Sequence, residues 1–150
     1  MNSTKLPKNQ RFILLIEDDE NDIELTRLAL KKNQITENIV VQSNGRRALQ
    51  YLNEVGNTRS YADKPSLILL DINMPEIDGI EVLKEIKQSA MLKDIPVVML
   101  SSSDERRDIS RSYNFGANSF VQKPVAFEEF VEAVKQIGKY WVNLNQTVSD

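Results

Sequence analysis

The sequence predicts an α/β fold in which helices cover both faces of a parallel β-sheet. Short apolar segments alternate with amphipathic segments five times along the 150 residues. Strict alternation of strand and helix patterns is typical of a parallel sheet with crossover helices. The chain length and the hydrophobic fraction of 41% suit one globular domain with its own core.

Five short apolar segments are expected to form the strands. They are Phe12–Ile16 and residues 39–41, 67–70, 97–100 and 118–122. Consecutive apolar residues are typical of strands that are buried on both faces. Because right-handed crossovers place the carboxyl ends of all strands at one edge, residues that follow the strands should share that edge.

The intervening segments have the apolar spacing of amphipathic helices. Helices are expected over residues 21–32, from Asn44 to about residue 55, over residues 79–89 and 105–115, and along residues 127–141. Asn44 and Asp104 are the expected N-caps of the second and fourth helices, because short polar side chains accept hydrogen bonds from the first turn. Gly116 is expected to end the fourth helix, and residues 56–64 are expected to form a loop.

Composition excludes several classes of function. A net charge of -3 and a pI of about 5.1 argue against a general binder of nucleic acid or of a membrane surface. The absence of cysteine and histidine excludes disulfides, thiolate chemistry and histidine metal ligands. No apolar run approaches the roughly 18 residues of a membrane span, and the N-terminus does not resemble a secretory signal. We therefore expect a cytoplasmic protein.

Polar and charged residues stand at the ends of four expected strands. They are Glu17 and Asp18, Asp71 with Asn73 two residues later, Ser101, and Lys123. Neighbouring carboxylates repel one another, so such a cluster needs a cation, and oxygen ligands without histidine or cysteine suit Mg²⁺. Mg²⁺ beside a lysine and a hydroxyl would stabilise a phosphoryl group in transfer, with Asp71 as the nucleophile that forms an aspartyl phosphate.

Taken singly, each of these residues has an ordinary structural explanation. The acidic run at residues 17–20 suits a solvated loop or the N-terminus of a helix, where acidic side chains are favoured. Asp71 alone could cap a turn, and Lys123 alone could be a solvated strand end. Their coincidence at four strand ends of one alternating pattern favours the functional interpretation.

From about Arg11 to Leu144 the sequence resembles bacterial response-regulator receiver domains. The matching segments are "ILLIEDDENDIEL", "LILLDINMPEIDGIEVLKEIK", "IPVVMLSSS" and "GANSFVQKPVAFEEF", and the spacing between them also agrees. The resemblance implies a three-layer, flavodoxin-like (βα)5 fold with the strand order 2-1-3-4-5. It implies one receiver domain over residues 1–150 with its core at about residues 11–144, and we expect no output domain.

The resemblance also implies roles for the strand-end residues. Asp71 matches the phosphoacceptor, and Lys123 matches the lysine that contacts the phosphoryl oxygens. For Mg²⁺, Asp18 matches the direct ligand and Glu17 a ligand that works largely through water. Asn73 matches the position whose backbone carbonyl completes the metal shell, which also includes Asp71. Asp19 and Glu20 are expected at the start of the first helix, facing solvent.

Two further positions resemble the switch residues of the family. Ser101 matches the switch hydroxyl, where threonine is more frequent, and Phe120 matches the switch aromatic. Because Phe120 lacks the hydroxyl of the commoner tyrosine, any signal there would be carried by packing. The resemblance further implies a cis peptide bond between Lys123 and Pro124.

A finer resemblance concerns the partners. The segments "GNTRSYADKPSLILLD" and "GKYWVNL" resemble the small receivers encoded beside cyanobacterial phytochromes, which are single-domain dimeric regulators. It implies a switch protein, not an enzyme, that takes its phosphoryl group from a sensor histidine kinase, here a phytochrome. We expect a homodimer through the fourth helix, fifth strand and fifth helix, with Tyr140 and Leu144 lying off the core stripe that ends at Trp141.

Two alternatives come from other classes. A haloacid-dehalogenase-type phosphatase also uses a strand-end aspartate with Mg²⁺, but it needs a second acid where this chain has Asn73. A flavodoxin-like mononucleotide binder would need a phosphate-binding loop after the first strand, where the acidic segment "EDDEND" would repel phosphate. Phosphoryl transfer from a small acyl phosphate without uptake of flavin would separate the three functions.

Overall fold

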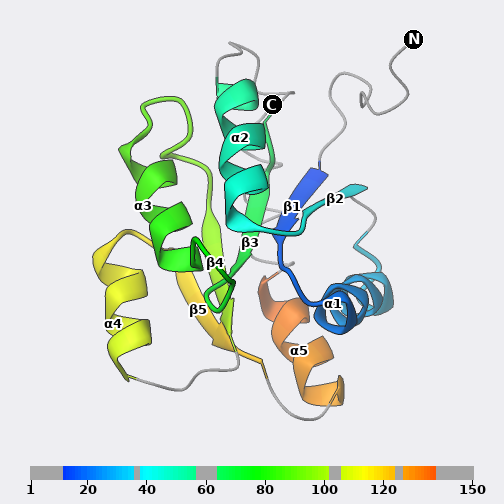
Figure 1. The fold of residues 1–150 in the computed structure, drawn as a ribbon. Coiled ribbons are helices and arrows are strands. Elements are labelled where there is room, and N and C mark those ends of the chain that lie inside the picture. The colour runs from blue at the N-terminus through cyan, green and yellow to red at the C-terminus, as the bar shows by residue number, and fades with distance from the viewer. Residues whose placement is uncertain (1–11, 36–37, 57–63, 102–105, 124–126, 138–150) are drawn as a thin grey trace, which may run out of the picture.

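The computed structural model describes residues 12–35, 38–56, 64–101, 106–123 and 127–137. A five-stranded parallel sheet forms its middle layer (Figure 1). The strands are β1 (Phe12–Ile16), β2 (Asn38–Gln42), β3 (Leu67–Asp71), β4 (Val97–Ser101) and β5 (Ser119–Gln122). They lie in the order β2-β1-β3-β4-β5, which confirms the predicted fold class and strand order.

Helices cover both faces of this sheet (Figure 1). They are α1 (Glu20–Lys32), α2 (Gly45–Gly56), α3 (Gly79–Gln88), α4 (Arg106–Asn114) and α5 (Phe127–Ile137). The helices α1 and α5 contact each other on one face, whereas α2, α3 and α4 follow one another on the other face. Among these helices none is long and apolar enough to cross a membrane.

Successive residues of the central strands alternate between two hydrophobic clusters. Leu14 lies in the cluster that includes Leu83 of α3, whereas Leu15 lies in the cluster that includes Leu30 of α1 and Phe130 of α5. Burying one such aliphatic side chain contributes roughly 1.5–3 kcal/mol to folding. Burial on both faces explains why the strand segments are apolar at consecutive positions and not at alternate ones.

Several predicted helix ends are confirmed. The backbone N–H of Arg47 donates a hydrogen bond of 2.8 Å to Oδ1 of Asn44, so Asn44 caps α2. Gly116 follows α4 with φ of 99°, in the left-handed region that glycine adopts readily. Asp104 and the part of the expected fifth helix beyond Ile137 lie outside the described residues.

Other element boundaries differ from the prediction. The expected loop began at Gly56, but α2 extends to include this residue. The third and fourth strands were expected to end at residues 70 and 100, but they extend to Asp71 and Ser101. In the sheet Asp71 pairs with Leu100, and Ser101 pairs with Gln122. Strand pairing depends on the backbone, so it tolerates polar side chains at a strand end. These two polar residues are therefore held by the sheet itself.

Candidate functional site

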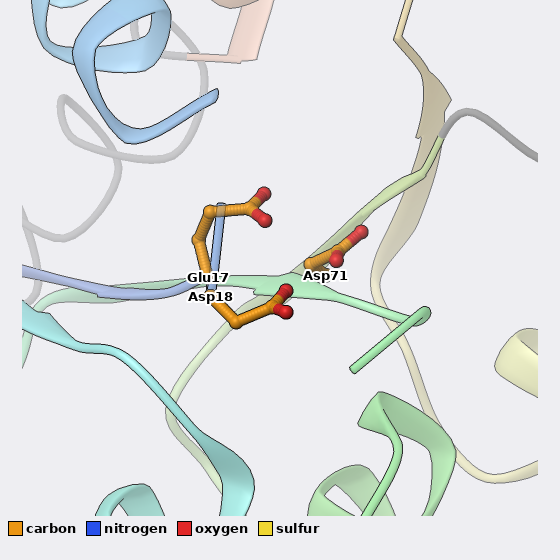
Figure 2. Close-up of side chains that lie close together, drawn as sticks. All are labelled: Glu17, Asp18 and Asp71. Carbon is orange, nitrogen blue, oxygen red and sulfur yellow. The ribbon is translucent and has the colours of Figure 1, made fainter. Parts of the chain in front are cut away.

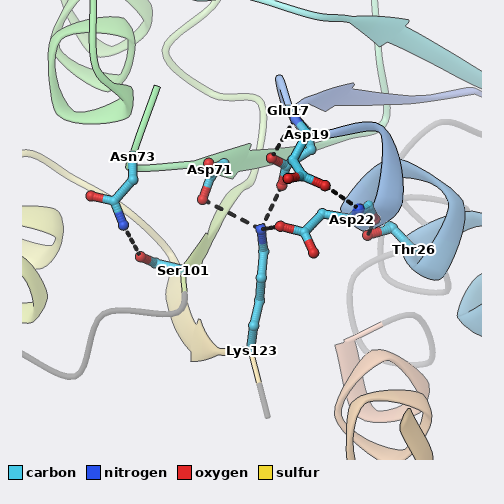
Figure 3. Close-up of polar contacts among 8 residues, drawn as sticks. All are labelled: Glu17, Asp19, Asp22, Thr26, Asp71, Asn73, Ser101 and Lys123. Carbon is cyan, nitrogen blue, oxygen red and sulfur yellow. Dashed lines mark hydrogen bonds and ion pairs between the residues drawn. The ribbon is translucent and has the colours of Figure 1, made fainter. Parts of the chain in front are cut away.

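The predicted site residues meet at the edge formed by the carboxyl ends of the strands (Figure 3). Asp71 and Ser101 are the last residues of β3 and β4, and Glu17 and Lys123 directly follow β1 and β5. Parallel pairing of β1 with β3, β3 with β4 and β4 with β5 brings these four residues together. The sheet thus places the charged groups in the arrangement that the alternating sequence pattern predicted.

Three carboxylates form a compact acidic cluster (Figure 2). Glu17, Asp18 and Asp71 each place one oxygen within 4.8 Å of the others. Glu17 is 1% exposed and Asp71 is 5% exposed, whereas Asp18 is open to solvent. A hard divalent cation prefers oxygen ligands and commonly keeps several waters, which the exposed side at Asp18 allows. The donor set therefore fits a divalent cation.

Lys123 neutralises part of this cluster through its contacts with Glu17 and Asp71 (Figure 3). Its Nζ lies 2.5 Å from Oε1 of Glu17, 2.9 Å from Oδ2 of Asp22 and 3.5 Å from Oδ1 of Asp71. The side chain of Lys123 is only 11% exposed. An ammonium group has three N–H donors, so three carboxylates can occupy all of them.

The buried position of these groups shifts their pKa values. Burial raises the pKa of Glu17 to about 7, because the opposing contact with Lys123 compensates only in part. Burial also raises the pKa of Asp71, again against the attraction of Lys123. Burial alone would lower the pKa of Lys123, but its carboxylate neighbours outweigh burial and raise the pKa above its usual range. The cluster holds more negative charge than one lysine neutralises, which favours cation binding.

Asn73 and Ser101 form a second polar contact at the same edge (Figure 3). The side-chain amide of Asn73 donates a hydrogen bond of 3.1 Å to Oγ of Ser101. Ser101 is fully buried, and its backbone carbonyl accepts a hydrogen bond of 2.7 Å from the N–H of Lys123. The sequence predicted a backbone role for Asn73, but this side-chain contact was not predicted.

A glycine allows the segment that follows Asp71 to fold back on the strand. A Cβ atom at Gly79 would lie 2.1 Å from the backbone oxygen of Asp71, far inside contact distance. The N–H of Gly79 also donates a hydrogen bond of 2.8 Å to the carbonyl of Ile72. Asp78 caps α3 by accepting from the N–H of Glu81 at 3.0 Å. The close approach at Gly79 thus fixes the backbone on both sides of Asn73.

Asp22 belongs to the site, although the sequence pattern did not identify it. This residue lies in the first turn of α1, and its carboxylate reaches Lys123 (Figure 3). The sequence signal for Asp22 is its position three residues after an aspartate that caps a helix. The first turn of the helix that follows β1 lies next to the carboxyl end of that strand, where the site forms. Asp19 is that N-cap, and both Asp19 and Glu20 are exposed, as predicted.

Phe120 lies where the fifth strand meets the fourth helix. Its side chain is half-buried against the cluster on the α2–α4 face of the sheet. Its backbone N–H donates a hydrogen bond of 3.1 Å to the hydroxyl of Tyr113 in α4. Pro124 lies outside the described residues, so the cis peptide bond expected after Lys123 stays a prediction.

Known proteins share this sequence and this fold. The sequence profile of the response regulator receiver domain matches residues 13–135. The probable methanogenesis regulatory protein FilR2 of Methanothrix harundinacea is 38% identical over 137 residues, covering 91% of this chain and 86% of its own length. Response regulator Rcp1 of Synechocystis is 36% identical over 132 residues, covering 88% of this chain and 89% of its own length.

Solved structures agree with these matches. The crystal structure of the phosphorylated cyanobacterial phytochrome response regulator RcpA is 38% identical with a TM-score of 0.79, covering 89% of this chain and 94% of that one. The Mn²⁺-bound form of Rcp1 is 35% identical with a TM-score of 0.75, covering 90% of this chain and 94% of that one. The chain therefore belongs to the response regulator receiver family and is similar to phytochrome response regulators.

Proposed function

We propose that this receiver is a phosphoacceptor switch in which Asp71 takes up a phosphoryl group. The observation that carries the proposal is the convergence of the Asp71 carboxylate, the Lys123 ammonium and the acidic cluster at one sheet edge. Asp71 is almost fully buried, yet it has an oxygen within 3.5 Å of the ammonium. A buried nucleophile beside a cation is the arrangement that forms and stabilises an acyl phosphate.

The proposed step is a transfer of one phosphoryl group without oxidation or reduction. A carboxylate oxygen of Asp71 attacks the phosphorus of a phosphohistidine or of a small acyl phosphate. The new O–P bond forms while the bond from phosphorus to the donor breaks, and the donor leaves with the electron pair. Lys123 then donates hydrogen bonds to the phosphoryl oxygens, which carry the charge. Hydrolysis returns the carboxylate of Asp71 and releases phosphate.

Mg²⁺ is the proposed cofactor. Glu17, Asp18, Asp71 and the backbone carbonyl of Asn73 would hold the ion, and the ion would neutralise charge on the carboxylates and the phosphoryl oxygens. The compact oxygen cluster of the first three residues supports this proposal, as does the Mn²⁺-bound form of the relative Rcp1. The oxygen-only donor set suits Mg²⁺ and Mn²⁺ alike, and we propose Mg²⁺ because it binds through few carboxylates and keeps several waters.

Ser101 and Phe120 are proposed to convert phosphorylation into a change of surface. The hydroxyl of Ser101 would turn from Asn73 towards a phosphoryl oxygen, and Phe120 would repack against α4. The contacts that support this route are the bond between Asn73 and Ser101 and the bond from Phe120 to Tyr113. The phosphoryl group would act through its differential stabilisation of two conformations.

The proposed partner is a sensor histidine kinase, and the relatives favour a phytochrome. RcpA is described as a cyanobacterial phytochrome response regulator, and its structure covers most of this chain. We also propose a homodimer through α4, β5 and α5 in the cytoplasm. The residues Tyr140 and Leu144, which motivate the dimer, lie outside the described residues.

The two alternative functions have less support. Asn73 occupies the place where a dehalogenase-type phosphatase needs its second acid, and its amide instead binds Ser101. A mononucleotide binder would have to place a negatively charged phosphate beside the carboxylates of Glu17 and Asp18, which already lie within 4.8 Å of each other. The matched family is also that of receivers. We therefore propose no separate substrate for this chain, only its own phosphorylation and dephosphorylation.

Incubation with acetyl phosphate and Mg²⁺ tests the proposed function. Phosphate-affinity electrophoresis should show a retarded band for the wild type and none for Asp71→Asn. Omitting Mg²⁺ should remove the band from the wild type as well. A band of equal strength in wild type and Asp71→Asn would overturn the assignment of Asp71.

A further inference from the structure

We propose that Asp22 is a positioning residue that competes with the phosphoryl group for the ammonium of Lys123. The inference rests on the phosphoacceptor role proposed for Asp71. In this structure Lys123 Nζ lies nearer to Asp22 (2.9 Å) than to Asp71 (3.5 Å). Asp22 thus draws the lysine away from the residue that would receive the phosphoryl group (Figure 3).

The backbone of Asp22 is fixed at both of its polar groups. Its N–H donates a hydrogen bond of 3.0 Å to Oδ1 of Asp19, and its carbonyl accepts one of 2.8 Å from the hydroxyl of Thr26. Thr26 is itself buried, so the first turn of α1 is held firmly against the domain. The backbone of Asp22 is therefore held in place, with its carboxylate in contact with Lys123.

The three contacts of the ammonium are not equally easy to break. A phosphoryl oxygen needs an N–H donor from Lys123, and Glu17, Asp22 and Asp71 compete for the donors present. Releasing Glu17, which is 1% exposed, would leave a carboxylate without solvent. The side chain of Asp22 is 35% exposed, so water can replace the ammonium there. Of the two shorter contacts of the ammonium, the one with Asp22 is accordingly the one that yields to the phosphoryl group.

Electrostatic repulsion is a second way in which Asp22 opposes the phosphoryl group. Asp22 adds a negative charge beside the place where a phosphoryl dianion would sit, and like charges repel. Asp22 is not one of the three residues of the acidic cluster, which are Glu17, Asp18 and Asp71. Neutralising Asp22 therefore leaves the proposed metal ligands in place while it releases Lys123 and lowers the repulsion. Asp22 would in this way limit the stability of the phosphorylated state.

Binding of beryllofluoride, a phosphoryl mimic, tests this inference by calorimetry in saturating Mg²⁺. Asp22→Asn, which keeps the size of the side chain, should bind on the order of tenfold more tightly than wild type, as expected for one charge removed a few ångströms away. Asp22→Ala should shift affinity in the same direction. The gain should shrink at high salt, because it is electrostatic. Glu20→Gln is the matched control, because Glu20 is an exposed acid in the same helical turn.

The outcomes separate this inference from the proposed function. A wild-type protein that does not bind beryllofluoride would overturn the phosphoacceptor proposal itself. Binding by wild type, with equal or weaker binding by both folded Asp22 variants, would overturn only the role of Asp22. An equal gain in Glu20→Gln would also overturn it, because the effect would then come from net charge and not from the contact with Lys123.

Discussion

The amide of Asn73 donates a hydrogen bond of 3.1 Å to the hydroxyl of Ser101, which links the loop after β3 to the end of β4. A neutral hydrogen bond contributes about 0.5–1.5 kcal/mol to stability. We predict a coupling free energy of about 0.5–1 kcal/mol between Asn73→Ala and Ser101→Ala in a double-mutant cycle of metal-free protein. Chemical denaturation of the four proteins measures it.

The same cycle also tests the proposed rotation of Ser101. With Mg²⁺ and beryllofluoride bound, the hydroxyl should face the phosphoryl mimic, so the coupling with Asn73 should fall towards zero. Strictly additive losses in the metal-free protein would contradict the hydrogen bond, and coupling that persists unchanged in the bound state would contradict the rotation.

The second prediction concerns the metal. Asp18→Asn should weaken Mg²⁺ binding at least tenfold in calorimetry, because it removes one of the three clustered carboxylates. Asp19→Asn is the control, because Asn caps a helix about as well as Asp and so preserves the start of α1. We expect less than a twofold change for Asp19→Asn. Equal losses in the two variants would show that the residues of the metal site are assigned wrongly.

The third prediction concerns pH. The pKa of Glu17 is about 7 in the fold but near 4.5, the ordinary value of a glutamate, in the unfolded chain, so the folded state binds more protons between these values. The contribution of Glu17 to the free energy of unfolding of metal-free protein should therefore be fully present below pH 4.5 and be lost as the pH rises from 4.5 through 7. Denaturant titrations across this range measure the slope.

Glu17→Gln is the matched variant for this slope. It removes the titrating carboxyl and should flatten the pH dependence, although the raised pKa of Asp71 keeps part of it. The chain has no histidine, so no imidazole titrates in the same range. A slope of opposite sign in the wild type would contradict the burial of an acidic group with a raised pKa.

The fourth prediction concerns the dimer. In sedimentation velocity we expect a wild-type dimer that tightens with beryllofluoride, and Tyr140→Ala should weaken it about tenfold if Tyr140 anchors the interface. Gln50→Ala is the control, because Gln50 is an exposed residue of α2, which packs against α3 and is not part of the proposed interface. A wild-type protein that stays monomeric at high micromolar concentration in both states would contradict the dimer.

The sequence predicted those parts of the site that the sheet determines. Glu17, Asp71 and Lys123 could be placed together because parallel strands bring their carboxyl ends to one edge, whatever their side chains do. The position of Asp22 in the first turn after β1 indicates that it lies near this edge, but its contact with Lys123 depends on the rotamer of a helical side chain. The amide contact between Asn73 and Ser101 depends likewise on a side chain in an irregular segment.

The most direct test of the central claim is the position of the acyl phosphate. Borohydride reduces an aspartyl phosphate to homoserine, so protein treated with acetyl phosphate and Mg²⁺, then reduced and digested, can be sequenced by tandem mass spectrometry. We predict homoserine at position 71, and none there when Mg²⁺ or acetyl phosphate is omitted. Homoserine at Asp18 or Asp19 with an unmodified Asp71 would contradict this prediction.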